Sequence, residues 1–418
     1  MGVLPSPVCH PRPVFFYHSV GIYRNKRSMN IDARIQRRQH RDGEPRLIRD
    51  YQPLSPVVHV DEPSDRGPVL ERLLDHLDPA FDGQLPPNAY VHGGAGTGKS
   101  AVVTALFSHL QRLSTERQSV IHTSTRIASP TAPGFVVVDL RGKTSQFAFY
   151  HSVLDALVDD PVPEHGISTG ELHGRLHDLL GESRTGVVVA VDHVDESGSV
   201  DVAELVDLFA GLPNNASWLA VGRTDPAEIA LTEYTATSIG IEPYRRQTLV
   251  DVLMARASEG LARQALDHEL VRRIARWADG NAHDALLALF VAADRADRAE
   301  RTQLLPADIE AAIEEIPRPP VSLGRVLALP ANKQLVLREL VDIDETQRAS
   351  VTATTEAISS GPVDLSPGTV KRFLYEMAEF GIVERVRAET RNGKGRPPSR
   401  VELCFPPTAF RRLYDLRQ

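Results

Sequence analysis

The chain has 418 residues, of which 42% are hydrophobic and 24% are charged, and its formal net charge is −8. This length and composition predict a soluble protein of two or three domains, and no stretch approaches the roughly 18 uninterrupted apolar residues that a membrane span needs. The two cysteines, Cys9 and Cys404, lie far apart, which excludes a disulfide framework or a zinc site built on cysteine. We therefore expect a cytoplasmic protein.

Arginine provides nearly all the positive charge, because only six of the 47 basic residues are lysine. Two interpretations stay open. One is adaptation to high salt, which screens surface charges strongly; the other is a GC-rich genome that favours arginine, alanine and valine codons. Neither interpretation specifies a partner.

The first residues, 1–45, are predicted to form a disordered tail. Prolines crowd the short apolar patch Phe15–Tyr17, and the first basic residue before this patch is Arg12. This arrangement makes a poor signal peptide.

From residue 46 to about residue 240 the chain alternates between predicted helices and predicted strands. A helical spacing of apolar residues runs from Val69 to Leu77. Nearly continuous apolar strands that are separated by helices predict a parallel sheet covered on both faces. The strands are predicted at 89–92, 134–140, 186–192 and 217–222.

From Tyr244 to about Ile316 the apolar spacing is helical throughout, and Pro317–Pro320 then interrupts the pattern. The remaining hundred residues predict further helices and two terminal strands. The helical segments before the interruption are 245–257, 267–278, 282–296 and 306–316, and the terminal strands fall within 381–388 and 399–405.

One segment between a predicted strand and a predicted helix matches the phosphate-binding pattern G-x-x-x-x-G-K-[ST]. In such a loop, backbone N–H groups surround the β-phosphate, the lysine reaches the β- and γ-phosphate oxygens, and the final hydroxyl ligates Mg²⁺. We therefore predict a site for ATP or ADP with Mg²⁺. The segment consists of Gly93, Gly94, Ala95, Gly96, Thr97, Gly98, Lys99 and Ser100.

The strand that ends at Asp192 predicts the second half of this site, because a carboxylate at such a position holds the magnesium ion. The next residue is His193, whereas most ATP-hydrolysing proteins of this type have a glutamate there that polarises the attacking water. A neutral imidazole lacks the fixed negative charge of a glutamate. We interpret the acids that follow, Asp195 and Glu196, as surface residues of a loop.

From about Arg49 to the C-terminus the chain resembles the archaeal origin-recognition and replication-initiator branch of the AAA+ ATPases. The resemblance rests on the phosphate loop, on EPYRRQTLVDVLMARA, which is similar to the proline–tyrosine start of that family's lid, on DGNAHDALLALFVAADRA, and on a terminal winged helix. It implies an α/β fold with Tyr244 at the nucleotide. The implied parts are an AAA+ P-loop core with a parallel sheet over 46–240, an all-α lid over 241–316 and a C-terminal winged helix over 321–418.

The departures from this family all fall around the nucleotide. The family's lid carries an arginine that touches the γ-phosphate, and His283 stands at that position. The strand 217–222 should be followed by a serine–asparagine pair whose amide orients the lytic water, but Arg223 and Thr224 stand there. The interval 226–243 contains no arginine, although the family keeps its inter-subunit arginine finger there, a group worth about 10³ or more in rate.

These substitutions predict a site that binds ATP and turns it over slowly or not at all. The phosphate loop and Asp192 are intact, but His193, Thr224 and His283 are atypical at catalytic positions. The resemblance implies that hydrolysis needs the groups which these three residues replace.

The segment Ser366–Arg400 has eight basic and four acidic residues in a chain that is acidic as a whole. Ser366 is a suitable helix cap, with Pro367 at the first helical position. The apolar residues of this helix share one face, so that Lys371 and Arg372 point outward. A helix in the major groove with a basic wing beside it predicts contact with duplex DNA. The candidate DNA-binding residues are Lys371, Arg372, Arg391, Lys394, Arg396 and Arg400.

The resemblance implies an origin-recognition-type initiator paralogue that binds ATP and duplex origin DNA and helps to place the replicative helicase. Two other functions stay open: a transcriptional regulator with an inert nucleotide fold, and an active AAA+ ATPase whose hydrolytic residues are displaced along the chain. The winged helix could also serve protein contacts, because a fold alone does not specify a function. The oligomeric state is left open.

Overall fold

The computed structural model describes residues 46–121, 133–143, 145–158, 160–182, 186–198, 200–344, 346–387 and 399–417. The tail expected over 1–45 lies outside these ranges. Within the described ranges, no helix combines the length and the apolar character that crossing a membrane requires.

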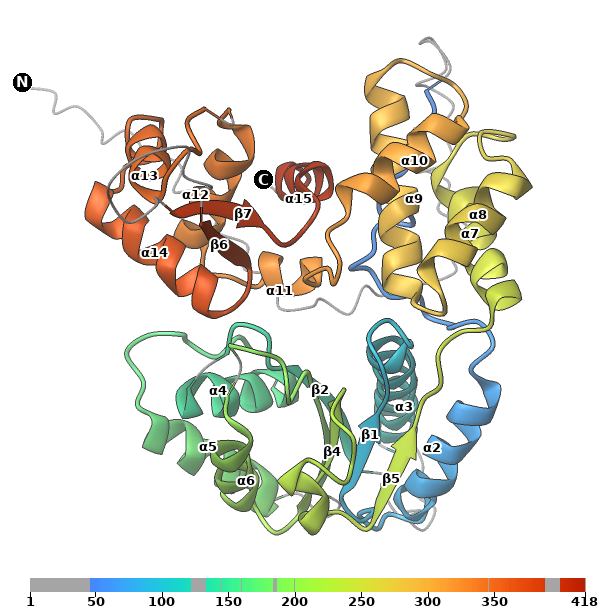
Figure 1. The fold of residues 1–418 in the computed structure, drawn as a ribbon. Helices are drawn as coiled ribbons and strands as arrows, with labels where there is room; N and C mark the ends of the chain where they lie inside the picture. The colour runs from blue at the N-terminus through green and yellow to red at the C-terminus, as the bar shows by residue number, and fades with distance from the viewer. Residues whose placement is uncertain are drawn as a thin grey trace, which may run out of the picture. The chain divides into compact units, whose positions relative to one another are not determined.

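A five-stranded parallel sheet with the strand order β2-β3-β4-β1-β5 organises the first part of the chain (Figure 1). The predicted parallel sheet is therefore confirmed, although sequence patterns did not reveal β5. That strand is a short edge strand in which only Ile239 is buried, so it has no continuous apolar run. The strands are β1 (Ala89–His92), β2 (Gly134–Asp139), β3 (Val187–Asp192), β4 (Ala216–Gly222) and β5 (Thr237–Gly240).

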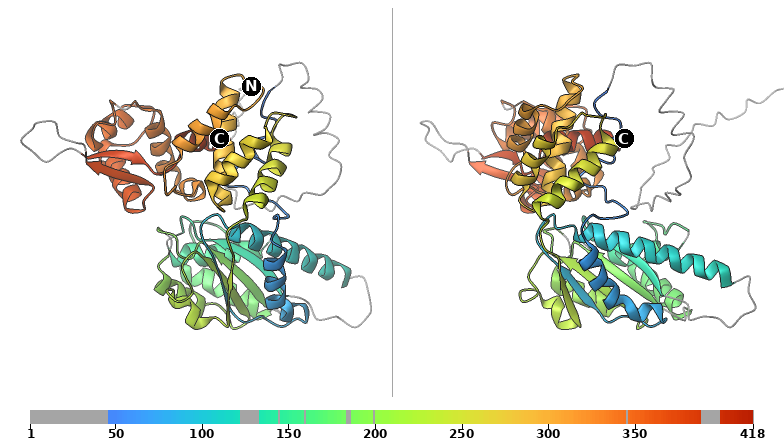
Figure 2. Two further views of the ribbon diagram at one scale, coloured as in Figure 1. Left: turned by 45° about the vertical axis from the view of Figure 1, so that its right-hand side comes forward. Right: turned by 90° about the vertical axis from the view of Figure 1, so that its right-hand side faces the viewer.

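Helices cover both faces of this sheet (Figures 1 and 2). All six residues of β3 are buried, and alternate residues of the strand pack into two different apolar clusters. This burial on both sides explains the unbroken run of small apolar residues in β3. Helices α2 (Gly67–Phe81) and α3 (Lys99–Ile121) cover one face, and α4 (Gln146–Leu157), α5 (Thr169–Glu182) and α6 (Val202–Ala210) cover the other. A 3₁₀ helix, η1 (Ala230–Tyr234), precedes β5.

The helical region that follows β5 is built around α9. Of the residues in this helix, all those from Asp284 to Ala296 except Arg295 are buried. The extended segment before α2 also belongs to this apolar cluster, because Leu47 and Leu54 pack into it. The helices are α7 (Arg246–Gly260), α8 (His268–Ala278), α9 (Ala282–Arg298) and α10 (Pro306–Glu315).

The C-terminal region combines helices with a small antiparallel sheet, as is compatible with the predicted winged helix. Helix α14 begins as expected, with the Ser366 hydroxyl accepting a hydrogen bond from the backbone N–H of Thr369. Its inward face consists of Val370, Leu374 and Met377. The elements are α11 (Leu323–Leu327), α12 (Ala331–Asp342), α13 (Val351–Ser359), α14 (Pro367–Glu379), β6 (Val383–Arg387), β7 (Ser399–Leu403) and α15 (Pro407–Asp415).

Candidate functional site

The predicted phosphate loop connects β1 to α3 at the carboxyl edge of the sheet. Gly96 and Gly98 have φ values of 67° and 81°, which glycine adopts at little steric cost. A Cβ atom on either residue would collide with a neighbour, because Gly96 lies against the side chain of Asn281 and Gly98 lies against the hydroxyl of Tyr244. Glycine is therefore required at both positions by the close approach of residues from after β5.

Lys99 is the first residue of α3, and its side chain turns back onto the loop. Its Nζ donates hydrogen bonds to the carbonyl oxygens of Gly93 at 2.7 Å and Gly94 at 2.8 Å. Burial, followed by the positive charge of Arg223, lowers the pKa of Lys99 to about 8. The ammonium group is therefore still largely protonated near neutral pH. Ser100 follows in the first turn of the same helix.

Two contacts from outside the loop hold it in place. The buried Arg66 donates a hydrogen bond of 2.7 Å to the carbonyl oxygen of Thr97, and its guanidinium lies 3.6 Å from the centroid of the Tyr244 ring. The backbone N–H of Ala282 donates to the carbonyl oxygen of Gly96 at 3.0 Å. Sequence analysis missed Arg66, because a single arginine before a helix belongs to no recognisable pattern.

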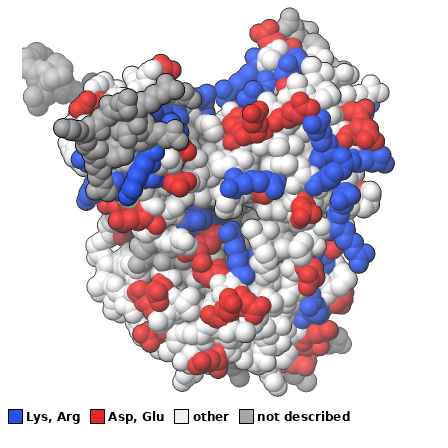
Figure 3. All heavy atoms as spheres, in the orientation of Figure 1, with Lys and Arg blue, Asp and Glu red and all other residues white. Residues whose placement is uncertain are grey.

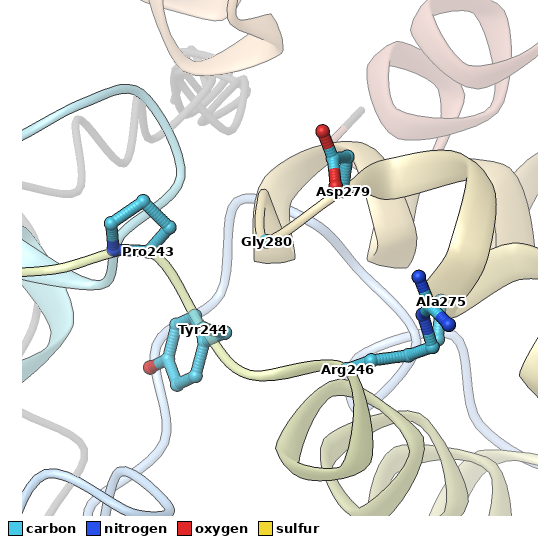
Figure 4. Close-up of a pocket in the computed structure, with 6 residues that line it drawn as sticks. All are labelled: Pro243, Tyr244, Arg246, Ala275, Asp279 and Gly280. Carbon is cyan, nitrogen blue, oxygen red and sulfur yellow. The ribbon is translucent and has the colours of Figure 1, made fainter.

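A pocket of about 380 Å³ opens where the chain enters the helical region (Figure 4). Tyr244 borders both this pocket and the phosphate loop. The position of Tyr244 is thus compatible with the nucleotide contact that sequence analysis predicts for it. The pocket is lined by Pro243, Tyr244, Arg246, Ala275, Asp279 and Gly280.

Asp192 lies at the end of β3, directly opposite Asp139 of β2. Its side chain is buried, and its Oδ1 accepts a hydrogen bond of 2.8 Å from the backbone N–H of His193. His193 has a φ of 66°, a left-handed conformation that is uncommon for residues other than glycine. The sharp turn at this point brings its ring back over the end of the sheet.

The ring of His193 lies between two carboxylates. Its Nδ1 is 3.2 Å from Oδ1 of Asp139 and 3.6 Å from Oδ1 of Asp192. Nδ1 is buried and has no hydrogen-bond partner among the described residues, so we treat both contacts as electrostatic. Burial alone would lower the pKa of His193, but Asp192 and Asp139 outweigh it and raise the pKa above its ordinary value. Nε and Nη2 of Arg141 also donate hydrogen bonds to Oδ2 of Asp139.

Our interpretation of Asp195 and Glu196 as surface acids is wrong. Oδ2 of Asp195 accepts hydrogen bonds from the backbone N–H of Arg223 at 2.6 Å, and from the N–H and hydroxyl of Thr224 at 2.5 and 2.7 Å. The side chain of Glu196 is only 4% exposed and forms an ion pair with Arg223. The loop turns inward here because two backbone N–H groups at the end of β4 need acceptors.

His283 lies in the first turn of α9, next to the phosphate loop. Its backbone nitrogen is among the atoms closest to Gly96. Nδ1 of its ring is 3.4 Å from Oδ1 of Asp284, and its Nε2 is buried without a hydrogen-bond partner among the described residues. The structure therefore brings His193, Thr224 and His283 to the edge of the sheet that holds the phosphate loop.

The candidate DNA-binding residues lie on the C-terminal region. Lys371 and Arg372 are exposed on α14, and Nε of Arg372 is 3.8 Å from Glu376. Arg400 is exposed on β7 and forms an ion pair of 2.5 Å with Glu402. The remaining candidates, Arg391, Lys394 and Arg396, lie outside the described residues.

Two further sets of exposed arginines were missed by sequence analysis. Arg385 and Arg387 lie on β6, where strand alternation places them on one face. On the face of the molecule shown in Figure 3, basic side chains also gather over α7 and α8. Surface acids partly neutralise that second set, because Arg272 pairs with Glu269 and Arg273 pairs with Glu310.

The chain is similar in sequence to known proteins. The family described as "AAA ATPase domain" matches residues 65–221. The ORC1-type DNA replication protein 1 of Aeropyrum pernix is 28% identical over 378 residues, which cover 85% of this chain and 92% of that protein. The chain therefore contains an AAA ATPase domain and is similar over most of its length to an ORC1-type DNA replication protein.

Two further comparisons extend the similarity over most of the chain. The ORC1-type DNA replication protein 5 of Halobacterium salinarum is 23% identical over 405 residues, which cover 85% of this chain and 89% of that protein. The structure of the Aeropyrum pernix ORC1 protein in complex with DNA matches with a TM-score of 0.56 at 24% identity, covering 88% of this chain and 96% of that chain. The fold is therefore shared over nearly the whole of that relative.

The AAA+ family implies a nucleotide with Mg²⁺, and the residues present fit this group. Two glycines of the loop have positive φ, and the Lys99 ammonium lies against the carbonyl oxygens of Gly93 and Gly94. Ser100 and the buried Asp192 are oxygen donors of the kind that Mg²⁺ prefers. The buried Nε2 of His283 is a further polar atom with no protein partner among the described residues. A bound Mg²⁺ would neutralise part of the charge of the phosphates.

Proposed function

We propose that the chain is an ORC1-type replication initiator that binds MgATP and duplex DNA and hydrolyses ATP slowly or not at all. One observation carries this proposal. The phosphate loop is complete, while the acidic side chains around Asp192 are all engaged by protein groups. Asp139 contacts Arg141 and His193, and Asp195 accepts hydrogen bonds from the end of β4.

Slow hydrolysis follows from the chemistry of the attacking water. A carboxylate or amide must orient this water, and cationic donors must stabilise the charge of the transition state. In the family, other residues orient the water and stabilise this charge. The corresponding positions in this chain are occupied by His193, Thr224 and His283. The hydroxyl of Thr224 donates to Asp195, and the ring of His193 lies against Asp139 and Asp192.

The engagement of Asp195 and Glu196 favours this proposal over an active ATPase with displaced catalytic residues. Such an enzyme would need a nearby carboxylate whose oxygen is accessible to water. Oδ2 of Asp195 accepts three hydrogen bonds, and its Oδ1 has no hydrogen-bond partner among the described residues but is buried away from solvent. Glu196 is buried in an ion pair with Arg223. Releasing Asp195 would leave the backbone N–H groups of Arg223 and Thr224 without this acceptor.

In this proposal ATP acts as a structural ligand that fixes the helical region onto the loop. The phosphate loop and the helical region are already in contact, because Ala282 donates to Gly96 and Tyr244 lies against Gly98. Phosphates held by the N–H groups of the loop would therefore contact residues from both parts.

The proposed DNA contact rests on the exposed basic residues of the C-terminal region and on the relative that is known in complex with DNA. We propose α14 for the major groove, with phosphate contacts from Lys371, Arg372 and Arg400. The relative from Aeropyrum pernix is named a DNA replication protein; we propose replication-origin DNA as the duplex and the replicative helicase as a partner of this chain.

The substitution Lys99→Ala tests nucleotide binding. We expect wild-type protein to gain about 2.7 kcal/mol of stability when MgATP is present at a hundredfold excess over its dissociation constant. Lys99→Ala should abolish this gain, measured as a shift in thermal unfolding. Arg272→Ala, which removes an exposed ion pair on α8, serves as the control and should keep the full shift. An equal MgATP shift in Lys99→Ala and wild type would refute the proposal.

A further inference from the structure

Arg223 lies at the edge of the sheet directly beside the phosphate loop. β1 and β4 are parallel neighbours, and their register pairs His92 with Gly222. The next residues along these strands are Gly93, which begins the loop, and Arg223. Because parallel strands present their carboxyl ends at the same edge, Arg223 emerges between the phosphate loop and Asp192 of β3.

The guanidinium of Arg223 forms an ion pair with Glu196. Breaking this ion pair would not disturb the backbone of β4. Its side chain is 43% exposed, while that of Glu196 is 4% exposed. The main chain at Arg223 is anchored separately, through the hydrogen bond of 2.6 Å from its N–H to Asp195. The positive charge of Arg223 acts on the phosphate loop, because it is the second cause, after burial, of the lowered pKa of Lys99.

Glu196 has a second cation, so the departure of Arg223 would not leave a buried carboxylate unpaired. Its Oε2 lies 3.8 Å from Nε of Arg325 in α11. Arg325 is itself fixed, because its guanidinium donates hydrogen bonds of 2.7 Å to the carbonyl oxygens of Ser197 and Phe380. The usual penalty for breaking a buried ion pair comes from the uncompensated charge that stays behind, and here Arg325 reduces that penalty.

We propose that Arg223 is a γ-phosphate ligand supplied by the same chain, and that its guanidinium leaves Glu196 for the triphosphate when MgATP binds. It replaces the arginine that is absent at His283. The assignment rests on the proposed binding of MgATP. A guanidinium can form two parallel hydrogen bonds to phosphate oxygens, which makes it well suited to this role.

The test is equilibrium binding of MgATP and of MgADP to the full chain, with wild type and Arg223→Gln. Loss of a charge-assisted contact to the γ-phosphate should weaken MgATP binding about tenfold or more. MgADP binding should change less than about twofold, because this ligand lacks the γ-phosphate. The matched control is Arg175→Gln, which removes an exposed arginine that pairs with a glutamate one turn away on α5. It should leave both affinities unchanged.

A second variant tests the exchange itself. Glu196→Gln removes the carboxylate that competes with the phosphate for Arg223, and it should strengthen MgATP binding about threefold while leaving MgADP unchanged. An equal loss of MgATP and MgADP binding in Arg223→Gln, or no loss at all, would overturn the inference while leaving the proposed function standing. Wild-type protein that binds neither nucleotide would overturn both.

Discussion

At the scale of single residues, the role of His193 depends on a neighbour that lies far away in the sequence. The sequence identifies it only as a histidine where a glutamate is expected. The structure adds Asp139, which faces Asp192 across β2 and β3 and lies 3.2 Å from the ring of His193. When protonated, the imidazole would offset part of the negative charge of these two carboxylates, and we assign it this electrostatic role.

The substitution His193→Asn separates this role from catalysis. Asparagine tolerates the left-handed backbone at this position, so the turn should be kept. We expect His193→Asn to retain the MgATP-dependent rise in melting temperature. Turnover in the presence of duplex DNA should stay below ~1 s⁻¹ for wild type and variant alike, which is under the usual range for enzymes. Faster wild-type hydrolysis that disappears in His193→Asn would show that His193 is catalytic.

At the scale of elements, α9 connects three parts of the chain through one buried carboxylate. Asp294 is completely buried in this helix. It pairs with Arg298 one turn along at 2.8 Å and with Arg412 of α15 at 2.5 Å, and it accepts a hydrogen bond of 3.1 Å from the hydroxyl of Tyr51. Because these partners come from the segment before α2, from α9 and from α15, Asp294 fixes how the three pack together.

Asp294→Asn should therefore be strongly destabilising. It removes the charge that compensates two partly buried guanidinium groups, and we expect the free energy of unfolding to fall by about 3 kcal/mol, as measured by urea denaturation. Asp297→Asn, which alters a weaker and less buried contact of 3.5 Å with Tyr51, should cost less than about 1 kcal/mol. Similar losses in the two variants would contradict the role assigned to Asp294.

At the scale of the whole molecule, the proposed nucleotide site and the proposed DNA contacts lie in different parts that share packing and ion pairs. The helices of the central helical region and those of the C-terminal region form one apolar cluster. The backbone N–H of Thr408 in α15 also donates to Glu315 of α10 at 2.8 Å. Arg325 adds a contact between the loop after β3 and α11. Substitutions on the exposed face of α14 should leave these contacts intact.

The double substitution Lys371→Glu and Arg372→Glu tests the DNA contacts of α14. Each lost phosphate contact should remove about one unit from the slope of log affinity against log salt, so the double variant should lose about two. Affinity should fall for duplexes of any sequence. The charge reversal Arg175→Glu on α5 is the control and should leave the slope unchanged, as should the MgATP-dependent stabilisation in the double variant. An unaltered slope would indicate that α14 contacts a protein partner instead.

The sequence by itself determined the features that are local in the chain. The phosphate loop occupies eight consecutive residues, and its glycines and lysine are recognisable wherever a strand and a helix flank them. Four of the five strands of the parallel sheet, the cap at Ser366 and the apolar face of α14 were predictable for the same reason. The apolar spacing of a strand or a helix can be recognised from residues that are close in the sequence, so no knowledge of the fold is needed to find it.

Only the tertiary structure decided which distant residues meet. The contact of Asp139 with His193, the buried pairing of Glu196 with Arg223 and Arg325, and the edge strand β5 all join segments that are far apart in the sequence. A charged residue has the same local pattern whether it faces water or a buried partner, so Asp195 and Glu196 were mistaken for surface acids. Asp195 accepts hydrogen bonds from N–H groups at the end of β4, and Glu196 pairs with Arg223 and Arg325, so these partners come together only once the sheet has formed.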